Sequence, residues 1–158
     1  MQIGENSIRC FHPDDTEAVV DLWQRCDLLR PWNDPYKDIN RKLDDSADLF
    51  YVMSAVPSGD QHNDETSPTP VIVGAAMVGY EGHRGWVNYL AVDPALQRAG
   101  LGRKLMAHIE AELLSRGCPK INLQVRETNT GVIEFYRTLG YQVDAAVSLG
   151  KRLIPDAE

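Results

Sequence analysis

A turn with two glycines, residues 97–102 with the sequence QRAGLG, has the composition of a phosphate-binding loop. Glycine adopts positive φ at little cost and lets a ligand approach the backbone closely. The turn follows a strand-like run over 86–92 and opens a helix-like run over 101–116. The first turn of such a helix carries unpaired N–H groups and the positive end of the helix dipole. The segment therefore predicts a site for an anionic group between a strand and a helix.

A second block, residues 129–141 with the sequence NTGVIEFYRTLGY, could supply a proton donor. A phenol with its ordinary pKa of about 10 is neutral at pH 7 and can protonate a leaving group, which makes Tyr136 a candidate acid. Tyr136 also shares a helical face with Val132 and Ile133, so a plain role in the core is the alternative. Asn129 stands where the helix would begin and could cap it.

Together the two blocks resemble the GNAT superfamily of acyl-CoA-dependent N-acyltransferases. The family carries [Q/R]-x-x-G-x-[G/A] at the start of a helix, which Gln97, Gly100 and Gly102 match in register. Its downstream pattern, N-x-x-A-x-x-[F/L]-Y-x-x-x-G-[F/Y], is similar to the block 129–141. The resemblance covers 71–152 well and the first half by element order. The second block also looks like that of enzymes that acetylate protein N-terminal amines.

The resemblance implies a GNAT-like fold, a mixed and largely antiparallel sheet of about seven strands flanked by about four helices. It implies acetyl-CoA as cosubstrate, with its pyrophosphate on the turn and its pantetheine arm between the strands over 86–92 and 121–126. Tyr136 would protonate the CoA thiolate, and Asn129 would hydrogen-bond the arm. The expected cofactor-binding residues are Leu90, Ala91, Val92, Gln97, Arg98, Ala99, Gly100, Leu101, Gly102, Arg103, Lys104, Asn129 and Tyr136.

The general base is where the match to the family fails. Related enzymes carry glutamate either where this chain has Gln124 or where it has Trp86, and neither of these side chains accepts a proton. The remaining candidates are Glu81, Glu127 and His83, of which Glu81 is our candidate catalytic residue beside Tyr136. Each could instead be a solvated turn residue. The acceptor amine could also lose its proton to bulk water before it binds.

The segment 28–35, with the sequence LLRPWNDP, joins the first two expected helices. In the family this region walls the acceptor site, so Trp32 could form an aromatic wall while Asp27 or Asp34 receives a cation. The alternative is that Trp32 packs on the core and Asp34 only caps a helix. The candidate substrate-binding residues are Trp32, Asp34 and Glu127.

Composition narrows the functional classes. The chain has 158 residues, enough for one domain over 1–158 with a real core. It carries 16 basic and 23 acidic residues, a net charge of −7, which disfavours nucleic-acid binding and mildly favours a cationic acceptor such as an amine. Arg98, Arg103 and Lys104 would have to offset this charge for the anionic CoA. The 3 separated cysteines predict neither a disulfide framework nor a metal site.

The element order predicts an α/β or α+β mixed fold. We expect a helix that starts near 13–17, capped by Asp14 with Glu17 as its capping-box partner, and a second helix that starts at Asp34-Pro35. The polar stretch 57–70 reads as a mobile loop. With no signal peptide and no membrane-length apolar run, a cytoplasmic monomer or homodimer is the default expectation. Strands are expected over 7–11, 49–56, 71–80, 86–92, 121–126 and twice within 141–153, and the later helices over 101–116 and 129–139.

Three functional hypotheses remain open at this point. The first is an N-acetyltransferase that moves acetyl from acetyl-CoA to a primary amine of a small molecule or peptide by direct attack. The second is a non-catalytic acyl-CoA-binding sensor or partner module of the same fold, suggested by the missing glutamate. The third, a Rossmann-type nucleotide-binding protein, lacks the third glycine and an early parallel βαβ unit.

Overall fold

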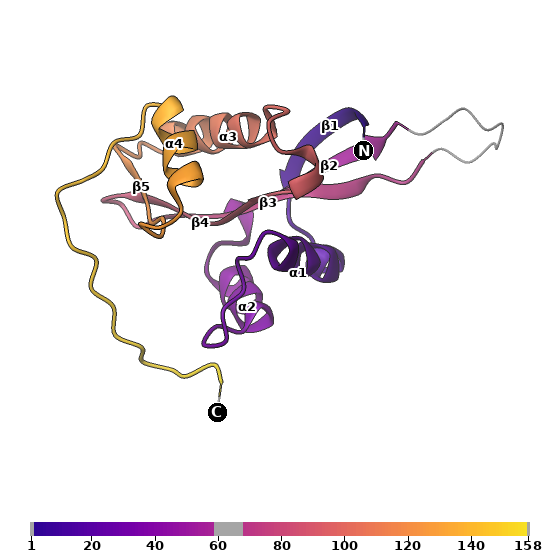
Figure 1. Cartoon of the computed structure of the whole chain (residues 1–158). Coiled ribbons are helices and arrows are strands. Elements are labelled where there is room, and N and C mark those ends of the chain that lie inside the picture. The colour runs from indigo at the N-terminus through magenta and orange to yellow at the C-terminus, as the bar shows by residue number, and fades with distance from the viewer. Residues whose placement is uncertain (1, 59–67, 158) are drawn as a thin grey trace.

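The computed structural model describes residues 2–58 and 68–157, and it is a mixed α/β fold with one five-stranded sheet (Figure 1). The strands follow the order β1-β2-β3-β4-β5, with antiparallel pairing up to β4 and parallel pairing between β4 and β5. Helices α1 and α2 cover one face of the sheet, and α3 and α4 cover the other. The elements are β1 (Ile3–Cys10), α1 (Thr16–Arg25), α2 (Pro35–Ser46), β2 (Phe50–Pro57), β3 (Val71–Tyr80), β4 (Gly85–Val92), α3 (Leu101–Ser115), β5 (Ile121–Leu123) and α4 (Thr130–Thr138).

The core has two layers because β2 and β3 bury side chains on both faces. Tyr51, Met53 and Val73 belong to the cluster that α3 completes with Leu105 and Ile109. On the other face, α1 contributes the fully buried Leu22 and Trp23 to a second cluster that includes Phe50 and Val52. The first expected helix is therefore present, and it packs its apolar side on the sheet.

The helix starts were predicted with mixed success. Asp34 caps α2 as expected, since its carboxylate accepts hydrogen bonds from the N–H groups of Tyr36 at 2.9 Å and Lys37 at 3.2 Å. The expected cap of the first helix by Asp14 and Glu17 is wrong. A short 3-10 turn precedes α1, and it is capped by His12 and Asp15, whose carboxylate accepts the His12 N–H at 2.8 Å.

Gly85 allows three elements to meet at the start of β4. A β-carbon built at Gly85 would lie 2.8 Å from a δ-carbon of Leu113 in α3 and 2.9 Å from the sulfur of Cys118. We expect Gly85→Ala to lower the free energy of unfolding by about 1–3 kcal/mol, because the added methyl overpacks this contact. Chemical denaturation measures the loss. Gly79→Ala is the control, since no described atom would lie within 4 Å of its new carbon; equal losses in both variants would contradict the packing explanation.

The two strands expected within 141–153 are wrong, so the described sheet has five strands instead of about seven. Residues 142–157 follow α4 and run without regular structure past the sheet to the start of α2 (Figure 1). Side chains hold this segment beside β5, because Asp144 accepts from Lys120 at 2.9 Å and from Asn122 at 2.7 Å. The strand β5 has only 3 residues and therefore offers little edge for a backbone ladder.

Most of the predicted mobile loop over 57–70 lies outside the described residues. No helix in the parts of the chain that the structure describes is long and apolar enough to cross a membrane.

Candidate active site

The turn over 97–102 joins β4 to α3 in a strained conformation. Gly100 caps α3 with a φ of +78°, and Arg98 has a φ of +72°, so two residues of the turn are left-handed. The N–H of Lys104 donates to the carbonyl of Gly100 at 3.0 Å, which closes the first helical turn. The N–H groups that precede it, from 101 to 103, are those that helix geometry leaves without an intrahelical acceptor. The predicted strand–turn–helix arrangement is confirmed.

Gly102 packs the helix against the downstream block. A β-carbon at Gly102 would lie 3.0 Å from the ring of Phe135 in α4. The second glycine of the motif is therefore needed at least in part for the contact between α3 and α4. This contact joins the two sequence blocks in space, although Gly102 and Phe135 are 33 positions apart in the sequence.

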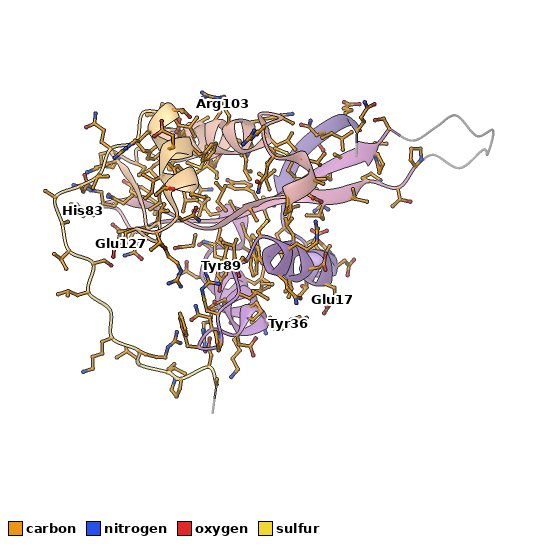
Figure 2. All side chains as sticks on the ribbon, in the orientation of Figure 1. Glu17, Tyr36, His83, Tyr89, Arg103 and Glu127 are labelled. Carbon is orange, nitrogen blue, oxygen red and sulfur yellow. The ribbon has the colours of Figure 1, made fainter. Side chains whose placement is uncertain are left out.

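The basic side chains around the turn point in different directions. Lys104 donates to the side chain and to the main-chain carbonyl of Asn6, so its ammonium group is directed toward β1. Arg103 lies on the side of α3 that points away from the sheet (Figure 2). Both Arg98 and Arg103 are outside the buried core. The backbone of the turn, more than these three side chains, is therefore the defined feature for an anion.

A bulge in β4 precedes the 97–102 turn, in the part of β4 that is no longer paired with β5. Asn88 pairs with Met77 and Ala91 pairs with Ala75, so Tyr89 and Leu90 together oppose one residue of β3. Such a bulge bends the strand and increases its twist. The parallel pairing with β5 ends at Val87, and the outer edge of β4 is unpaired with β5 from there on.

The expected arm-binding residues 90–92 lie in this open stretch. Leu90 is partly buried, and Ala91 is buried at the boundary of the α1–α2 layer. The carbonyl of Val92 accepts a hydrogen bond from the thiol of Cys26 at 3.2 Å. Because the pairing with β5 ends at Val87, the β5 side of β4 has room here for an extended chain as an added strand.

Tyr89 is a residue of the site that the sequence did not reveal. It has a φ of +53° at the bulge, and its ring stacks on Trp23 at a centroid distance of 4.1 Å. Its hydroxyl donates to Asp38 of α2 at 2.6 Å, and burial together with this bond raises the pKa of Tyr89. A positive φ at a non-glycine residue has no signal in the sequence, and the contact with Asp38 spans 51 residues.

Tyr136 is buried in α4 between two aromatic neighbours. Tyr136 is 7% exposed. Its ring lies edge-on to the rings of Phe135 and Tyr141, with centroid distances of 5.0 Å and 5.5 Å. Burial raises the pKa of Tyr136, so its phenol is neutral at physiological pH. Asn129 caps α4 by accepting the N–H of Val132 at 3.4 Å. The core role considered for Tyr136 and the capping role considered for Asn129 are therefore confirmed. Neither role removes the proton from the Tyr136 phenol.

Two of the three candidate bases, Glu81 and His83, do not lie with these residues. Glu81 accepts the N–H of Arg84 at 2.6 Å within the β3–β4 turn, where His83 also lies. This turn is at the opposite end of β4 from the 97–102 turn (Figures 1 and 2), roughly 25 Å away along 8 strand residues. Gln124 donates to Ser148 of the C-terminal segment. Glu127 is exposed in the turn after β5.

In the loop between α1 and α2, Trp32 is 51% exposed, so the alternative that it packs in the core is wrong. The guanidinium of Arg126, which follows β5, lies 5.9 Å from the centre of the Trp32 ring. This cation–π contact joins the loop between α1 and α2 to the far side of the opened sheet. The carboxylate of Asp34 is occupied by the capping bonds of α2. The described residues contain no cluster of three or more metal-ligating side chains.

A sheet opened between β4 and a parallel β5, with a glycine turn leading into a helix beside the opening, defines an acetyltransferase-type α/β protein. The family model described as the acetyltransferase (GNAT) family matches residues 16–141, and the chain belongs to this family. It is 49% identical over 151 residues to an acetyltransferase of Pectobacterium atrosepticum, covering 96% of this chain and 98% of that protein.

Solved structures share the fold at lower sequence identity. Ard1 from Thermoplasma volcanium superposes with a TM-score of 0.70 at 23% identity, covering 89% of this chain and 84% of that one. The ribosomal-protein-S18-alanine N-acetyltransferase from Escherichia coli gives a TM-score of 0.63 at 24% identity, covering 86% and 77%. These likenesses show the fold.

Proposed function

We propose that this protein transfers an acetyl group from acetyl-CoA to a primary amine by direct attack of the amine on the thioester. The observation that supports it most is the open edge of β4 beyond the Tyr89 bulge, which leads directly into the turn at Gly100. An extended arm and an anionic diphosphate would find complementary partners in this order along the chain. Members of the family to which the chain belongs are named acetyltransferases.

The donor would bind through backbone groups. The diphosphate would accept hydrogen bonds from N–H groups of the 97–102 turn and the first turn of α3, where the helix dipole adds favourable charge. The pantetheine arm would pair with residues 90–92 as an added strand. Asn129 would contact the arm from the start of α4, beyond its capping bond.

The chemistry needs few protein groups because a thioester is already activated. The amine nitrogen forms a bond to the acetyl carbon, the carbon–sulfur bond breaks, and the electron pair leaves on the CoA sulfur. Tyr136 would donate its proton to that thiolate, since its raised pKa keeps the phenol protonated. The nitrogen loses its extra proton to solvent, and solvent returns a proton to Tyr136 after each turnover. Positioning supplies most of the acceleration.

The acceptor would approach past Trp32 and Glu127, with the start of α2 at Asp34 as a further wall. The second sequence block favours an N-terminal peptide amine over other primary amines. The candidate bases Glu81 and His83 occupy a distant solvated turn, so we infer that the amine arrives already deprotonated by bulk water. Glu81 then acts at most through solvent.

Multiple-turnover assays test this function. The protein is mixed with acetyl-CoA and, in separate reactions, with a peptide bearing a free N-terminal alanine, a polyamine and lysine; free thiol and acetylated amine are measured together. We expect equal amounts of CoA and acetylated product over many turnovers. Tight acetyl-CoA binding with no acetylated amine would favour the non-catalytic acyl-CoA sensor, and thiol release without product would indicate hydrolysis.

A further inference from the structure

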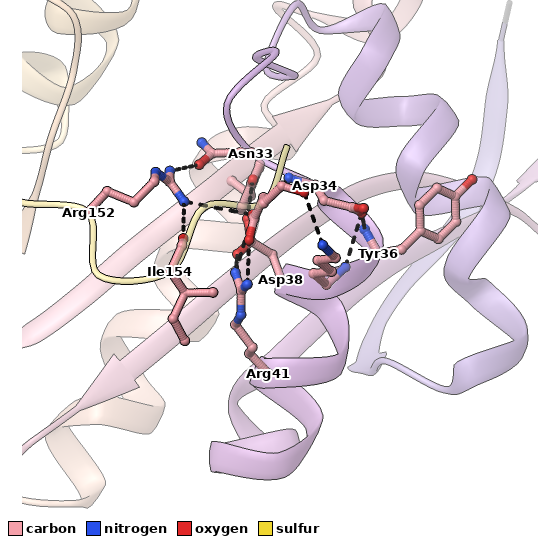
Figure 3. Close-up of polar contacts among 10 residues, drawn as sticks. Asn33, Asp34, Tyr36, Asp38, Arg41, Arg152 and Ile154 are labelled. Atoms are coloured by element: carbon pink, nitrogen blue, oxygen red, sulfur yellow. Dashed lines mark hydrogen bonds and ion pairs between the residues drawn. The ribbon is translucent and has the colours of Figure 1, made fainter. Parts of the chain in front are cut away.

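The segment 142–157 ends against the acceptor side of the protein. It crosses from α4 to the start of α2 (Figure 1), where Arg152 donates to the side chain of Asn33. Asp156 contacts Asp34, Lys37 and Arg41 at the first turns of α2. Figure 3 labels two of these partners, Asp34 and Arg41. These contacts join the C-terminal segment to a loop that lies more than 110 residues earlier in the chain.

The carboxylate of Asp156 accepts hydrogen bonds from the loop over 32–34 and from helix α2. It accepts the N–H of Asp34 at 2.9 Å, and it forms an ion pair with Arg41 of α2. Lys37 donates from its ammonium group to the main-chain carbonyl of Asp156 at 3.0 Å. One residue therefore fixes both the last residue of the loop and the following helix.

The burial of this carboxylate makes the contacts specific. Its side chain is 1% exposed, and a buried charge is tolerated only when it is paired and hydrogen-bonded. Hydrogen bonds from Arg41 and from the Asp34 N–H lower the pKa of Asp156 to about 2. The carboxylate therefore remains charged, and its contacts persist, throughout the physiological pH range.

The same ion pair leads on to the bulge of β4. Arg41 also donates to Asp38 at 3.0 Å, and the other oxygen of Asp38 accepts the Tyr89 hydroxyl at 2.6 Å. Tyr89 directly precedes the stretch 90–92 that would hold the thioester end of the donor. The chain of contacts from Asp156 thus reaches both the acceptor loop and the donor strand.

We propose that Asp156 is a positioning residue that clamps the loop over 32–34 and the start of α2 in the geometry that receives the acceptor amine. This inference rests on the proposed function, because it assigns the loop to the acceptor. Trp32 is then held from two sides, by Arg126 across its ring and by Arg152 and Asp156 through the next two residues. The C-terminal segment determines acceptor affinity without touching the reacting atoms.

The test compares Asp156→Asn with Asp144→Asn, a matched change in the same segment. Asp144 pairs with Lys120 and Asn122 beside β5, away from the loop. With the N-terminal alanine peptide as acceptor, we expect Asp156→Asn to raise the acceptor KM about tenfold with little change in kcat, the pattern of lost acceptor binding. The dissociation constant for acetyl-CoA should stay at the wild-type value in both variants. Amide hydrogen exchange should accelerate over 32–37 in Asp156→Asn alone.

The possible outcomes separate this inference from the function beneath it. If the wild-type protein acetylates no amine of the panel, the proposed function fails first and the positioning role with it. If the wild-type protein turns over and Asp156→Asn keeps both its KM and its exchange rates, the clamp is wrong while the function stands. An equal rise in KM for Asp144→Asn would overturn the assignment to Asp156. Thermal unfolding of both variants identifies a loss that comes from misfolding, in which case the hydrogen-exchange pattern of Arg41→Lys decides.

Discussion

Gly100→Glu is expected to raise the dissociation constant for acetyl-CoA about 100-fold or more. This is the effect of losing one or two charge-assisted hydrogen bonds to the diphosphate. The glutamate would stand at the N-terminal end of α3, where the N–H groups from 101 to 103 are available. Its negative charge would repel the diphosphate and compete for the same donors. Isothermal titration with acetyl-CoA and with free CoA measures the change.

Gly117→Glu is the matched control for this variant. Gly117 follows the other end of α3 and has a φ of +81°, close to the +78° of Gly100, and neither would bring a new β-carbon within 4 Å of a described atom. Both substitutions add the same charge and the same left-handed strain, about 1–2 kcal/mol. Equal weakening of acetyl-CoA binding in both variants would mean that the effect is a loss of stability and that the turn is not the diphosphate site.

Tyr136→Phe is expected to lower kcat about 100- to 1,000-fold while the dissociation constant for acetyl-CoA stays the same, as for loss of a general acid. Phenylalanine keeps the ring and its contacts with Phe135 and Tyr141 in the core. The pKa of Tyr136 is raised above its unfolded value of about 10, so the neutral phenol is present throughout pH 6–9 and is lost only at more alkaline pH. The defect should therefore be constant across that range.

Tyr141→Phe provides the comparison, because Tyr141 lies against Tyr136 and donates to Glu110 at 2.8 Å. Removing its hydroxyl should leave kcat within about threefold of the wild type, since only a structural hydrogen bond of about 1 kcal/mol is lost. Steady-state kinetics from pH 6 to 9 measure both variants. Full turnover by Tyr136→Phe across this range would show that the acid assignment is wrong.

Helix α2 shows how far local signals in the sequence reach. Asp34 and Pro35 mark its start because a capping carboxylate and a first-turn proline act on atoms within four residues. The turn at Gly100 and the start of α3 are defined equally locally. The capping pair at the start of α1 was mispredicted because His12 and Asp15 form their own capping box, and the sequence pattern does not rank such competing polar neighbours.

The C-terminal segment shows where such signals end. Val147, Leu149 and Leu153 alternate as in a strand, and yet they are 84% exposed or more, in a segment without regular structure. Whether an apolar alternation pairs as a strand depends on the edge it meets. Here β5 presents only 3 residues, and ion pairs at Asp144 and Asp156 hold the segment instead.

The sequence alone determined the family, the phosphate-type turn and the neutral acid candidate, because each depends on residue types at short, fixed spacings. It also determined that no glutamate stands at the two positions where relatives carry a base. Only the tertiary structure decided the bulge at Tyr89, the exposure of Trp32 and the anchoring of the loop over 32–34 by Asp156. Those features depend on contacts across 51 to 122 residues, and chain folding, not local preference, brings such residues together.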